Sequence, residues 1–443
     1  MKNKLFVISV DAMVHEDVEY LMAKPNFSEI MKKEKRAEVE KVCTVYPSLT
    51  FPAHTSILTG CNPGKHGIYT NQPPIKPYKD GYSHWYMESS TVRVEDIFAA
   101  AKRAGCTTAS VYWPVSNNNP NVDYLIGENY YYFPKNEEFV ESFVRMGTNE
   151  QTMEIIKDNL WRIPSDFIEG KFGKGPKGRY VLDDFLVGCS CSLVEKYQPD
   201  VLFVHNIYLD TLRHGHGVFS DESREALDRM DEWLGDIANS MKKAGVYEDT
   251  NFVIISDHGQ MDFHRYVKIN ALLAKGGFIE FAPDGSIYDW RAFAKTNGFS
   301  LGVYLADPNY EAMKQKVHEY LLKLKDEGCW GIENVYTAEE VRERYGTYGL
   351  FSFVLESDGD TAFHDDWEGQ ISCTIDEITG YKAKHGYQPE KGPQPVFLAV
   401  GPNFKEGVCI PSAYVIDEAP TFAKILGQEM PQAEGRVLEE LIR

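Results

Sequence analysis

The sequence predicts an α/β fold in which helices cover both faces of a mostly parallel central sheet, with a small α+β domain inserted into it. Three observations predict this arrangement. Short, continuous apolar runs alternate with longer helical patterns, as expected for strands that are buried on both faces. Three of these runs are followed, at once or within a few residues, by an aspartate. Between about residues 265 and 380 the pattern changes, and the earlier alternation then resumes.

The first part of the chain begins with a strand over Leu5–Val10, because this run is apolar throughout. An extended run at Val42–Val45 then gives way to a helix that we expect to begin at Thr50. Pro52 suits the first helical turn, where its missing N–H costs nothing, and Gly60 suits the helix end. Further elements are predicted as helices over Pro25–Lys33 and Val94–Ala104 and a strand over Thr108–Tyr112.

The middle of the chain repeats the strand and helix alternation. Residues 135–180 are predicted to form polar helices and loops, with an exposed stretch at Gly170–Gly178. The elements that follow are a helix over Val181–Tyr197, a strand over Pro199–His205, a long amphipathic helix over Asp221–Ala244 and a strand over Asn251–Ser256. Parallel sheets bind ligands beyond the carboxyl ends of their strands, so this edge is where we expect a site.

The inserted domain is predicted to span residues 265–380, so that the catalytic core comprises residues 1–264 and 381–443. Its predicted elements are strands over Ser300–Leu305, Ile332–Tyr336 and Phe351–Leu355 and a helix over Asn309–Glu327. A strand over Pro395–Val400 and a helix over Glu418–Leu426 then complete the core.

Composition excludes some classes of partner. The chain is 43% hydrophobic and 13% aromatic, as in a soluble globular protein, and its formal net charge is −20. This charge would repel a long nucleic acid, whereas a small anion remains possible where bound cations offset the field. No stretch has the length and pattern of a signal peptide or a membrane span. We therefore expect a cytoplasmic protein with no membrane partner, whose oligomeric state the sequence leaves open.

The cysteines fit the same expectation. The eight cysteines are scattered and contain no CxxC pair. In a reducing compartment such residues are mostly small buried hydrophobes, and we expect no disulfide framework.

The candidate metal ligands are carboxylates and imidazoles at the predicted strand ends and in one loop: Asp11, Asp210, His214, Asp257, His258 and His385. This mixture suits Zn²⁺, or Mn²⁺ less strongly, whereas calcium sites lack histidines. Six ligands exceed what one tetrahedral zinc needs. Two divalent ions about 4 Å apart, with Thr50 as a further ligand, account for the number and would activate that hydroxyl.

Thr50 is the candidate nucleophile. Its hydroxyl would face the free N–H groups at the start of a helix, a favourable place for phosphate. A threonine hydroxyl is a poor nucleophile without a base or a metal, and the alternative is a simple helix cap. The metal ligands elsewhere in the chain favour the nucleophile.

A set of motifs gives the chain a family resemblance. They are Val7–Asp11, Thr50–His54, Gly60–Ile68, Asn71, Tyr112–Pro114, Asp210-x-x-x-His214, Ile255–Gly259, His385-Gly and Ala399–Pro402. In this order, over almost the full length, they resemble the alkaline phosphatase superfamily and within it the type I phosphodiesterase/nucleotide pyrophosphatase group.

The resemblance implies an alkaline phosphatase-like core and a hydrolase of phosphodiester or pyrophosphate bonds in nucleotide-type small substrates, acting through a covalent phospho-threonine. It implies one metal held by Asp210, His214 and His385, and a second held by Asp11, Thr50, Asp257 and His258. It also implies that Asn71 and the Phe51 N–H grip a phosphoryl oxygen.

The sequence departs from the family pattern at two positions. Ala12 and Arg213 stand where relatives commonly have glycine. Arg213 is a candidate contact for a doubly charged phosphate or a carboxylate of the substrate, but a surface ion pair is the favoured interpretation of this residue alone.

Aromatic residues provide a candidate wall for a base or aryl group. Phe51, Tyr112, Trp113 and the cluster Tyr130–Tyr132 are the candidates, with ordinary packing as the alternative. His364 is a weaker candidate for a substrate contact from the inserted domain.

Other functions are weighed against this one. A phosphomonoesterase or a phosphonoacetate-type C–P hydrolase would use the same two metals and threonine. A sulfatase is disfavoured because its Cys/Ser-x-Pro-x-Arg motif is absent, and a cofactor-independent mutase because that branch uses serine. A metal-stabilised binding protein without turnover ranks lower, because all seven ligand positions carry competent residues.

Overall fold

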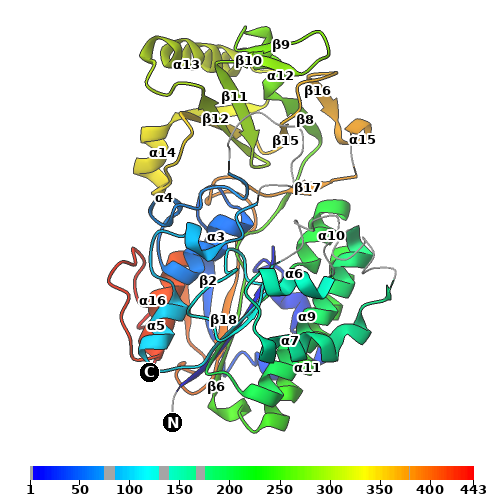
Figure 1. Ribbon diagram of the computed structural model, residues 1–443, viewed down its shortest axis with the longest axis vertical. Coiled ribbons are helices and arrows are strands. Elements are labelled where there is room, and N and C mark those ends of the chain that lie inside the picture. The colour runs from blue at the N-terminus through cyan, green and yellow to red at the C-terminus, as the bar shows by residue number, and fades with distance from the viewer. Residues whose placement is uncertain (1–2, 74–84, 129–138, 166–174, 379) are drawn as a thin grey trace.

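The computed structural model describes residues 3–73, 85–128, 139–165, 175–378 and 380–443. Its largest sheet has eight strands in the order β19-β2-β18-β6-β1-β5-β3-β4 (Figure 1). Every neighbouring pair in this sheet is parallel except the two pairs that include β18, so the predicted mostly parallel sheet is confirmed. The strands are β1 (Lys4–Val10), β2 (Ala37–Cys43), β3 (Thr108–Val111), β4 (Tyr124–Ile126), β5 (Val201–Asn206), β6 (Thr250–Ile255), β18 (Phe397–Val400) and β19 (Cys409–Tyr414).

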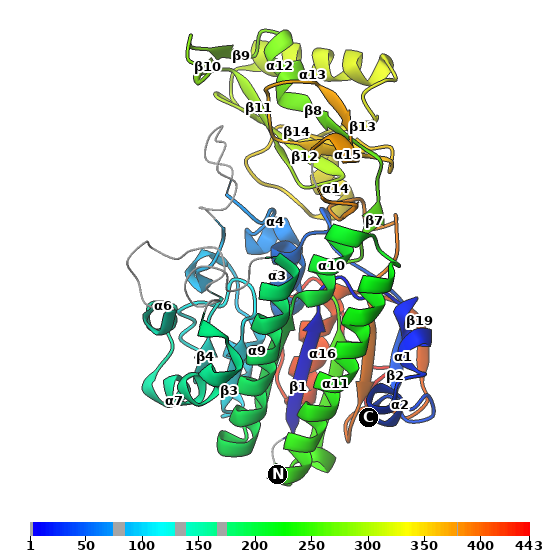
Figure 2. The ribbon, with the colours of Figure 1, turned by 90° about the vertical axis from the view of Figure 1, so that its right-hand side faces the viewer.

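Helices cover both faces of the sheet, as the apolar runs predict. In β1, Phe6 and Ile8 pack into one core, and Leu5 and Val7 pack into the core on the opposite face. Figure 2 looks onto the first layer, with β1 visible behind α9 and α11. This layer contains α1 (Asp17–Leu21), α2 (Pro25–Ile30), α6 (Phe139–Arg145), α7 (Glu150–Asn159), α9 (Gly175–Tyr197), α10 (Tyr208–His216) and α11 (Asp221–Ala244).

The second layer lies on the other face, at the left in Figure 1. It contains α3 (Thr50–Thr59), α5 (Ile97–Arg103) and α16 (Glu418–Ile425), with the short α4 (Pro63–His66) beside α3. Single 3₁₀ turns are η1 (Ser89–Thr91), η2 (Leu160–Arg162), η3 (Tyr247–Asp249) and η4 (Val415–Asp417).

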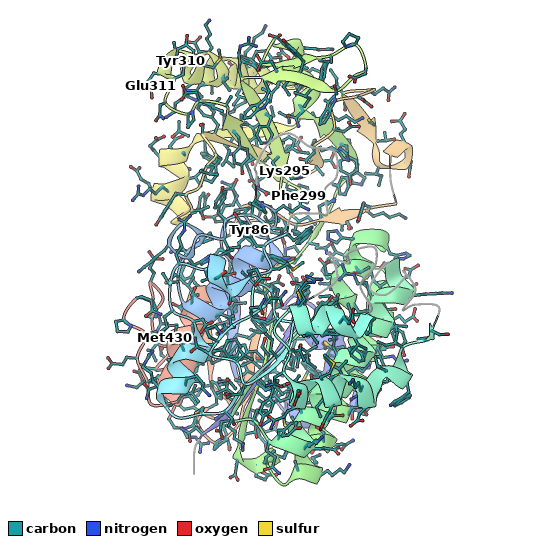
Figure 3. All side chains as sticks on the ribbon, in the orientation of Figure 1. Tyr86, Lys295, Phe299, Tyr310, Glu311 and Met430 are labelled. Carbon is teal, nitrogen blue, oxygen red and sulfur yellow. The ribbon has the colours of Figure 1, made fainter. Side chains whose placement is uncertain are left out.

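A smaller part of the molecule lies above the main sheet in Figure 1 and has its own sheets and core. In Figure 3, Lys295 and Phe299 mark the side of this part that faces the main sheet, and Tyr310 and Glu311 its far side. Its four-stranded sheet has the order β11-β12-β14-β13 and is antiparallel throughout. The predicted β-α-β unit is present as β12, α13 and β13, and β14 lies between its two strands.

The elements of this smaller part are β8 (Arg265–Lys268), α12 (Ile269–Lys275), β9 (Ile279–Phe281), β10 (Ile287–Trp290), β11 (Ala292–Thr296), β12 (Ser300–Leu305), α13 (Glu311–Asp326), β13 (Ile332–Thr337), α14 (Ala338–Tyr345), β14 (Phe353–Ser357), β15 (Thr361–His364), β16 (Ser372–Thr374) and α15 (Ile375–Ile378). The chain passes between the two parts beside a two-stranded sheet of β7 (Met261–Asp262) and β17 (Ala383–Lys384). The domain limits 265–380 stay a prediction.

Several predicted element boundaries differ from the structure, among them the following three. The extended run placed at Val42–Val45 belongs to a strand that starts earlier and ends at Cys43. The strand that was expected to include Tyr112 ends at Val111, because Tyr112 turns to φ +59°. Helix α9 begins at Gly175, so part of the predicted exposed stretch Gly170–Gly178 is helical, and its other residues lie outside the described ranges. A long helix that packs on its neighbours can extend through residues of weak propensity.

Two further observations concern the whole described chain. Within the described ranges, no helix is both long enough and apolar enough to cross a lipid bilayer. All eight cysteines are described and all are free.

Candidate active site

The predicted ligands converge at the carboxyl edge of the main sheet because β6, β1 and β5 are neighbours in it. Asp11 follows β1, Asp257 follows β6 after one residue, and α10 begins just beyond β5. Adjacent parallel strands end at the same edge, so residues 246 positions apart in the chain can meet there. We name Asp210, His214 and His385 the helix group, and Asp11, Asp257 and His258 the strand group.

The helix group offers three ligand atoms within 4.8 Å of one another. Asp210 and His214 are one turn apart on α10, and His214 Nε2 lies 3.3 Å from Asp210 Oδ1. The opposite ring nitrogen of His214, Nδ1, donates to the Ala383 carbonyl at 2.8 Å, which leaves Nε2 for a metal. All three side chains are half-buried.

The third member of the helix group, His385, reaches the site because a glycine follows it. Gly386 has φ +89°, and a Cβ there would lie 1.8 Å from the Asn297 carbonyl oxygen. Its N–H donates to the Ser48 carbonyl at 2.9 Å. The ring of His385 stacks on His258 with centroids 4.2 Å apart, so this loop joins the two groups.

The strand group is buried. His258 Nε2 lies 3.1 Å from Asp257 Oδ2 and 3.6 Å from Asp11 Oδ1. Atoms of Asp11, Asp210 and His258 also lie within 4.8 Å of one another, so Asp210 is close to the members of both groups. The structure thus brings together all six predicted carboxylate and imidazole ligands.

Thr50 is the first residue of α3 and is buried beside the strand group. Its Oγ1 lies 3.2 Å from His258 Nε2. Leu49, not Thr50, is the residue that precedes the first helical turn, and no side chain caps this end. The simple helix-cap alternative is therefore not what the structure shows, and the hydroxyl is directed to the ligand cluster.

Asn71 and the Phe51 N–H are adjacent, as a shared role would require. The Phe51 N–H donates to Asn71 Oδ1 at 3.0 Å. In this arrangement the Phe51 N–H is bonded to the Asn71 oxygen. Both residues could donate to one phosphoryl oxygen only after the Asn71 amide turns so that its NH₂ faces that oxygen.

Buried polar residues around these ligands hold them in place. His205 Nε2 donates to Asp11 Oδ2 at 3.1 Å, and His54 lies between Ser9 Oγ, at 2.9 Å, and the Thr50 carbonyl, at 2.8 Å. The sequence reasoning missed Gln260, which donates to Asp210 Oδ1 at 2.6 Å. Its position directly after the Asp257-His258-Gly259 motif is the signal that could have identified it.

The electrostatics of the cluster suit bound cations. Burial raises the pKa of Asp257 to about 8, and burial together with Asp257 and Asp210 raises the pKa of Asp11 well above its usual value. Burial also lowers the pKa of His214 and of His385 to about 3, so both imidazoles are neutral at pH 7. Neutral imidazoles beside crowded carboxylates are the donor set that divalent zinc or manganese takes.

Unpartnered atoms point to the same conclusion. Asp11 Oδ1, Asp257 Oδ2 and His385 Nδ1 are buried and accept or donate no hydrogen bond among the described residues. Buried polar atoms are normally satisfied, and here a pair of divalent ions would satisfy them. The residues present therefore fit the metal centre that the sequence predicts.

Trp113 is not at the site, which corrects its assignment to substrate binding. Its side chain is fully buried in the core and packs edge-on against His54 and Phe203. The indole ring fills space between α3 and the sheet, so the packing alternative explains it. Tyr112 is likewise fully buried, and Tyr130–Tyr132 lie outside the described residues.

Arg213 is also not available to a substrate, which corrects a second assignment. Its side chain is fully buried, and its guanidinium donates to Asp17 Oδ1 at 2.6 Å and to the Ala12 carbonyl. Arg213 forms an ion pair, as the alternative predicted, but its pair with Asp17 is buried and not on the surface. The position next to His214 suggested a cation at the edge of the active site. The side-chain conformation shows instead that Arg213 points into the interior.

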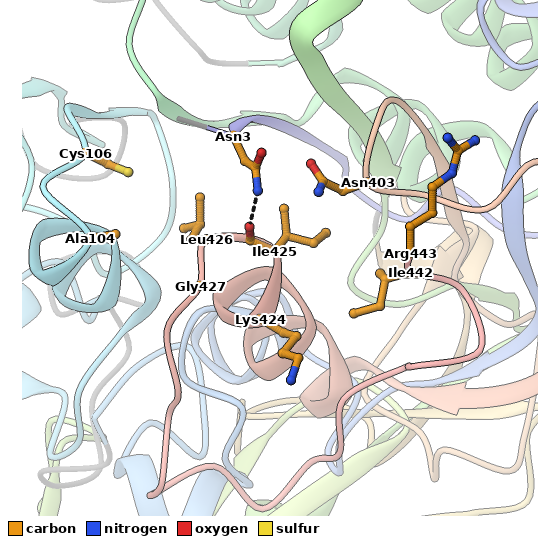
Figure 4. Close-up of a pocket in the computed structure, with 10 residues that line it drawn as sticks. All are labelled: Asn3, Ala104, Cys106, Asn403, Lys424, Ile425, Leu426, Gly427, Ile442 and Arg443. Atoms are coloured by element: carbon orange, nitrogen blue, oxygen red, sulfur yellow. Dashed lines mark hydrogen bonds between the residues drawn. The ribbon is translucent and has the colours of Figure 1, made fainter. Parts of the chain in front are cut away.

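Two other features lie away from the cluster. His364 is half-buried in the smaller part, where its Nδ1 accepts from the Asp366 N–H at 3.1 Å, and no described contact joins it to the ligands. A cavity of about 370 Å³ lies near the amino end of the sheet, lined in part by Asn3, Lys424 and Arg443 (Figure 4). This cavity contains none of the predicted site residues.

Comparisons with known proteins find matches to one family. The family model described as "Type I phosphodiesterase / nucleotide pyrophosphatase" matches residues 5–388. Bis(5'-adenosyl)-triphosphatase enpp4 of Xenopus laevis is 21% identical over 441 residues, which cover 96% of this chain and 78% of that protein. Human ectonucleotide pyrophosphatase/phosphodiesterase family member 5 is 25% identical over 417 residues, 91% of this chain and 70% of that protein. Human family member 1 is 23% identical over 240 residues, and the match spans only 21% of its length.

Solved structures share the fold. Human ectonucleotide pyrophosphatase/phosphodiesterase 5 aligns with a TM-score of 0.69 and 18% identity, covering 99% of this chain and 100% of that chain. The murine protein, solved as an inactive threonine-to-alanine variant in complex with AMP, aligns with a TM-score of 0.66 and 17% identity over 100% of both chains.

Proposed function

The chain belongs to the type I phosphodiesterase/nucleotide pyrophosphatase family, and we propose that it hydrolyses a phosphodiester or pyrophosphate bond in a small nucleotide-type substrate. The observation that carries the proposal is the position of Thr50, whose hydroxyl lies at the start of α3 and 3.2 Å from His258 Nε2. An alcohol beside a cluster of metal-type ligands is the arrangement of an activated nucleophile.

Two divalent ions are part of the proposal, with Zn²⁺ favoured over Mn²⁺. The helix group would hold one ion, and the strand group with Thr50 would hold the other. When bound, such ions lower the pKa of a nearby hydroxyl and offset the charge of a phosphoryl group. Two overlapping candidate ligand groups, one of Asp210, His214 and His385 and one of Asp11, Asp210 and His258, support two adjacent ions.

The chain's own residues then have defined roles. Thr50 Oγ1 forms a bond to phosphorus as the bond from phosphorus to the leaving oxygen breaks, and the hydroxyl proton passes to solvent water. Water next breaks the Oγ1–P bond of the phospho-threonine and restores the hydroxyl, so the configuration at phosphorus is retained overall. The Phe51 N–H and the Asn71 amide would stabilise the charge on a nonbridging oxygen, each by about 3 kcal/mol.

A phosphomonoesterase or a phosphonoacetate-type hydrolase is the second candidate. Its local support was Arg213, as a cation for a second negative charge on the substrate. Because that guanidinium is committed to Asp17 and the Ala12 carbonyl, this support is removed. The family match likewise favours the diester or pyrophosphate reaction.

The function is tested by relative rates on a nitrophenyl nucleotide diester, nitrophenyl phosphate and phosphonoacetate, with added Zn²⁺ or Mn²⁺ and elemental analysis of the protein. We expect the diester to be hydrolysed fastest. Thr50→Ala should lower hydrolysis by at least about 10³-fold while most of the metal is retained. Thr59→Ala, at the other end of the same helix, is the matched control and should stay within about twofold of the parent. A Thr50→Ala protein as active as the parent would show that Thr50 is not the nucleophile.

A cytoplasmic location belongs to the same proposal. It is supported by the eight free cysteines, which suit a reducing compartment. Thiol titration of protein isolated without reductant should find all eight thiols, and a substantial shortfall from disulfides would contradict this location.

A further inference from the structure

Arg213 makes an unusual set of contacts for a residue between two candidate metal ligands. It lies on α10, three residues after Asp210 and next to His214, and its side chain has no exposed surface. One end of its guanidinium donates to the Ala12 carbonyl and the other to Asp17 Oδ1 at 2.6 Å. A fully buried charge that binds two acceptors fixes the distance between the elements that carry them.

The Ala12 peptide is in turn bonded to the strand group. Ala12 directly follows Asp11, and its N–H donates to Asp257 Oδ1 at 3.2 Å. The residue has φ +62°, a left-handed conformation that a side chain with a Cβ disfavours. An external hydrogen bond to its carbonyl is therefore a means of holding the conformation that directs the N–H toward Asp257.

Asp17, at the other end of the loop that follows Asp11, also contacts Arg213. One carboxylate oxygen of Asp17 pairs with Arg213, and the other accepts from the Val14 N–H at 2.8 Å. The loop over residues 12–17, which begins at the end of the ligand Asp11, is thus held against α10 through a single guanidinium.

We propose that Arg213 is a positioning residue that sets the separation of the helix group from the strand group by clamping the Ala12 peptide and Asp17 to α10. Its guanidinium is bonded to the Ala12 carbonyl and Asp17, and among the described residues no hydrogen bond joins it to a candidate ligand. The inference deepens the proposed function, because the separation of the two groups matters only where they hold two ions. The two positions at which the sequence departs from the family pattern, Ala12 and Arg213, are here bonded to each other.

Arg213→Lys tests the clamp, because lysine keeps the charge but cannot reach two acceptors with a rigid fork. The chain offers a matched control in Arg36, a buried arginine that donates to Glu38 Oε2 at 2.6 Å and to the Met31 carbonyl at 3.1 Å, away from the site. Zinc is titrated calorimetrically into the metal-free parent, Arg213→Lys and Arg36→Lys, with elemental analysis of the loaded proteins.

We expect Arg213→Lys to weaken binding of at least one zinc ion by about 10- to 100-fold, the range seen when residues that orient metal ligands are changed. Arg36→Lys should bind zinc within about twofold of the parent, although both substitutions lower the melting temperature. Adding Ala12→Gly to Arg213→Lys should regain several-fold in affinity, because glycine adopts the left-handed conformation without the clamp. Zinc affinity of Arg213→Lys equal to that of the parent, or no weaker than that of Arg36→Lys, overturns the proposal.

Asp17→Asn provides a second variant should Arg213→Lys fail to fold. It keeps an oxygen acceptor but removes the charge that holds the guanidinium, and it should weaken zinc binding in the same direction by several-fold. Unchanged zinc affinity in this variant also overturns the clamp.

Hydrolysis at saturating zinc separates this inference from the proposed function. A parent protein that binds two zinc ions but hydrolyses no diester overturns the proposed function and leaves the clamp standing. A parent that hydrolyses the diester, beside an Arg213→Lys variant with parental zinc affinity, overturns the clamp alone.

Discussion

The two ligand groups of the site have similar chemistry but different surroundings. The helix group is half-buried, and its supports are one glutamine side chain and one backbone carbonyl. In the strand group Asp11 and Asp257 are fully enclosed and receive hydrogen bonds from His205 and the Ala12 N–H. The comparison leads us to expect that the enclosed group depends more strongly on a bound cation than the half-buried group does, although their ligand types are similar. Enclosed carboxylates have no water to stabilise their charge.

Loss of a strand-group carboxylate should have the largest effect. Asp257→Asn removes the anionic oxygen at the most buried ligand position, and we expect kcat/KM to fall by at least about 10³-fold with the loss of one bound ion per chain. Kinetics together with elemental analysis measure both quantities. Retention of two ions with near-parental turnover would break the comparison, because it would show that the enclosed group does not hold an ion.

Substitution of Asn71 should lower turnover without changing metal binding by the helix group or the strand group. Asn71→Ala should reduce kcat by about 10²- to 10³-fold with unchanged metal content, because it removes a donor to the developing charge. Asn71→Asp keeps an acceptor for the Phe51 N–H but repels phosphate, so it should lose at least as much. Single-turnover rates on the diester decide this, and an alanine variant with parental kcat would remove Asn71 from the oxygen-binding role.

Gln260→Met should affect the helix group alone. The substitution conserves volume but removes the hydrogen bond that orients Asp210, so affinity for the less enclosed ion should fall by about tenfold. Competition with a metal chelator measures the two affinities separately. Gln432→Met is a control, since the Gln432 side chain donates to the Glu95 carbonyl and, among the described residues, forms no hydrogen bond to a candidate ligand. Equal weakening of both ions would show that the two groups are not supported independently.

The smallest expected effect concerns the buried carboxylate that anchors α10, the helix of the helix group. Asp183 Oδ2 accepts from the N–H groups of Ile207 and Tyr208, and burial raises the pKa of Asp183 to about 8. The pKa in the folded state is above the unfolded value, so Asp183 contributes stability that is complete below about pH 4 and is lost as the pH rises through about 8.

Between pH 6.5 and 8.5 the zinc-saturated parent should therefore lose about 1 to 2 kcal/mol of unfolding free energy through Asp183. Asp183→Asn, which stays neutral and keeps an acceptor for the helix N–H groups, should lack this part of the slope. Thermal unfolding of both proteins at the two pH values provides the test. Identical slopes would mean that Asp183 is ionised throughout this range.

Much of the fold follows from local pattern. Continuous apolar runs predicted the buried strands β1, β5 and β6, because a strand covered on both faces needs apolar side chains on both. The amphipathic period placed α11 over Asp221–Ala244, the bounds observed. Local sequence patterns were less informative about where an element begins or ends when contacts with other elements decide that boundary. The start of α9 and the end of β2 are decided by packing and pairing partners far away in the chain.

The site divides in the same way. The seven predicted ligands were nominated from residue type and from their places near predicted strand ends, at a helix start and in one loop. The structural roles of Trp113 and Arg213 could not be predicted from residue type and position in the sequence. Both stand next to site motifs, but their side chains point into the interior, and side-chain direction follows from the space that packing leaves.

By itself, then, the sequence determined which side chains could hold metal and which hydroxyl could attack, because donor chemistry and strand-end position are local properties. Only the tertiary structure decided that His205 and Gln260 form hydrogen bonds to Asp11 and Asp210 and that the Arg213 guanidinium is buried against Asp17. It also decided that one ligand group is enclosed while the other is half-buried. Hydrogen bonds between residues about 50 to 200 positions apart, such as Gln260 to Asp210 and Arg213 to Ala12, form only when folding brings the partners together.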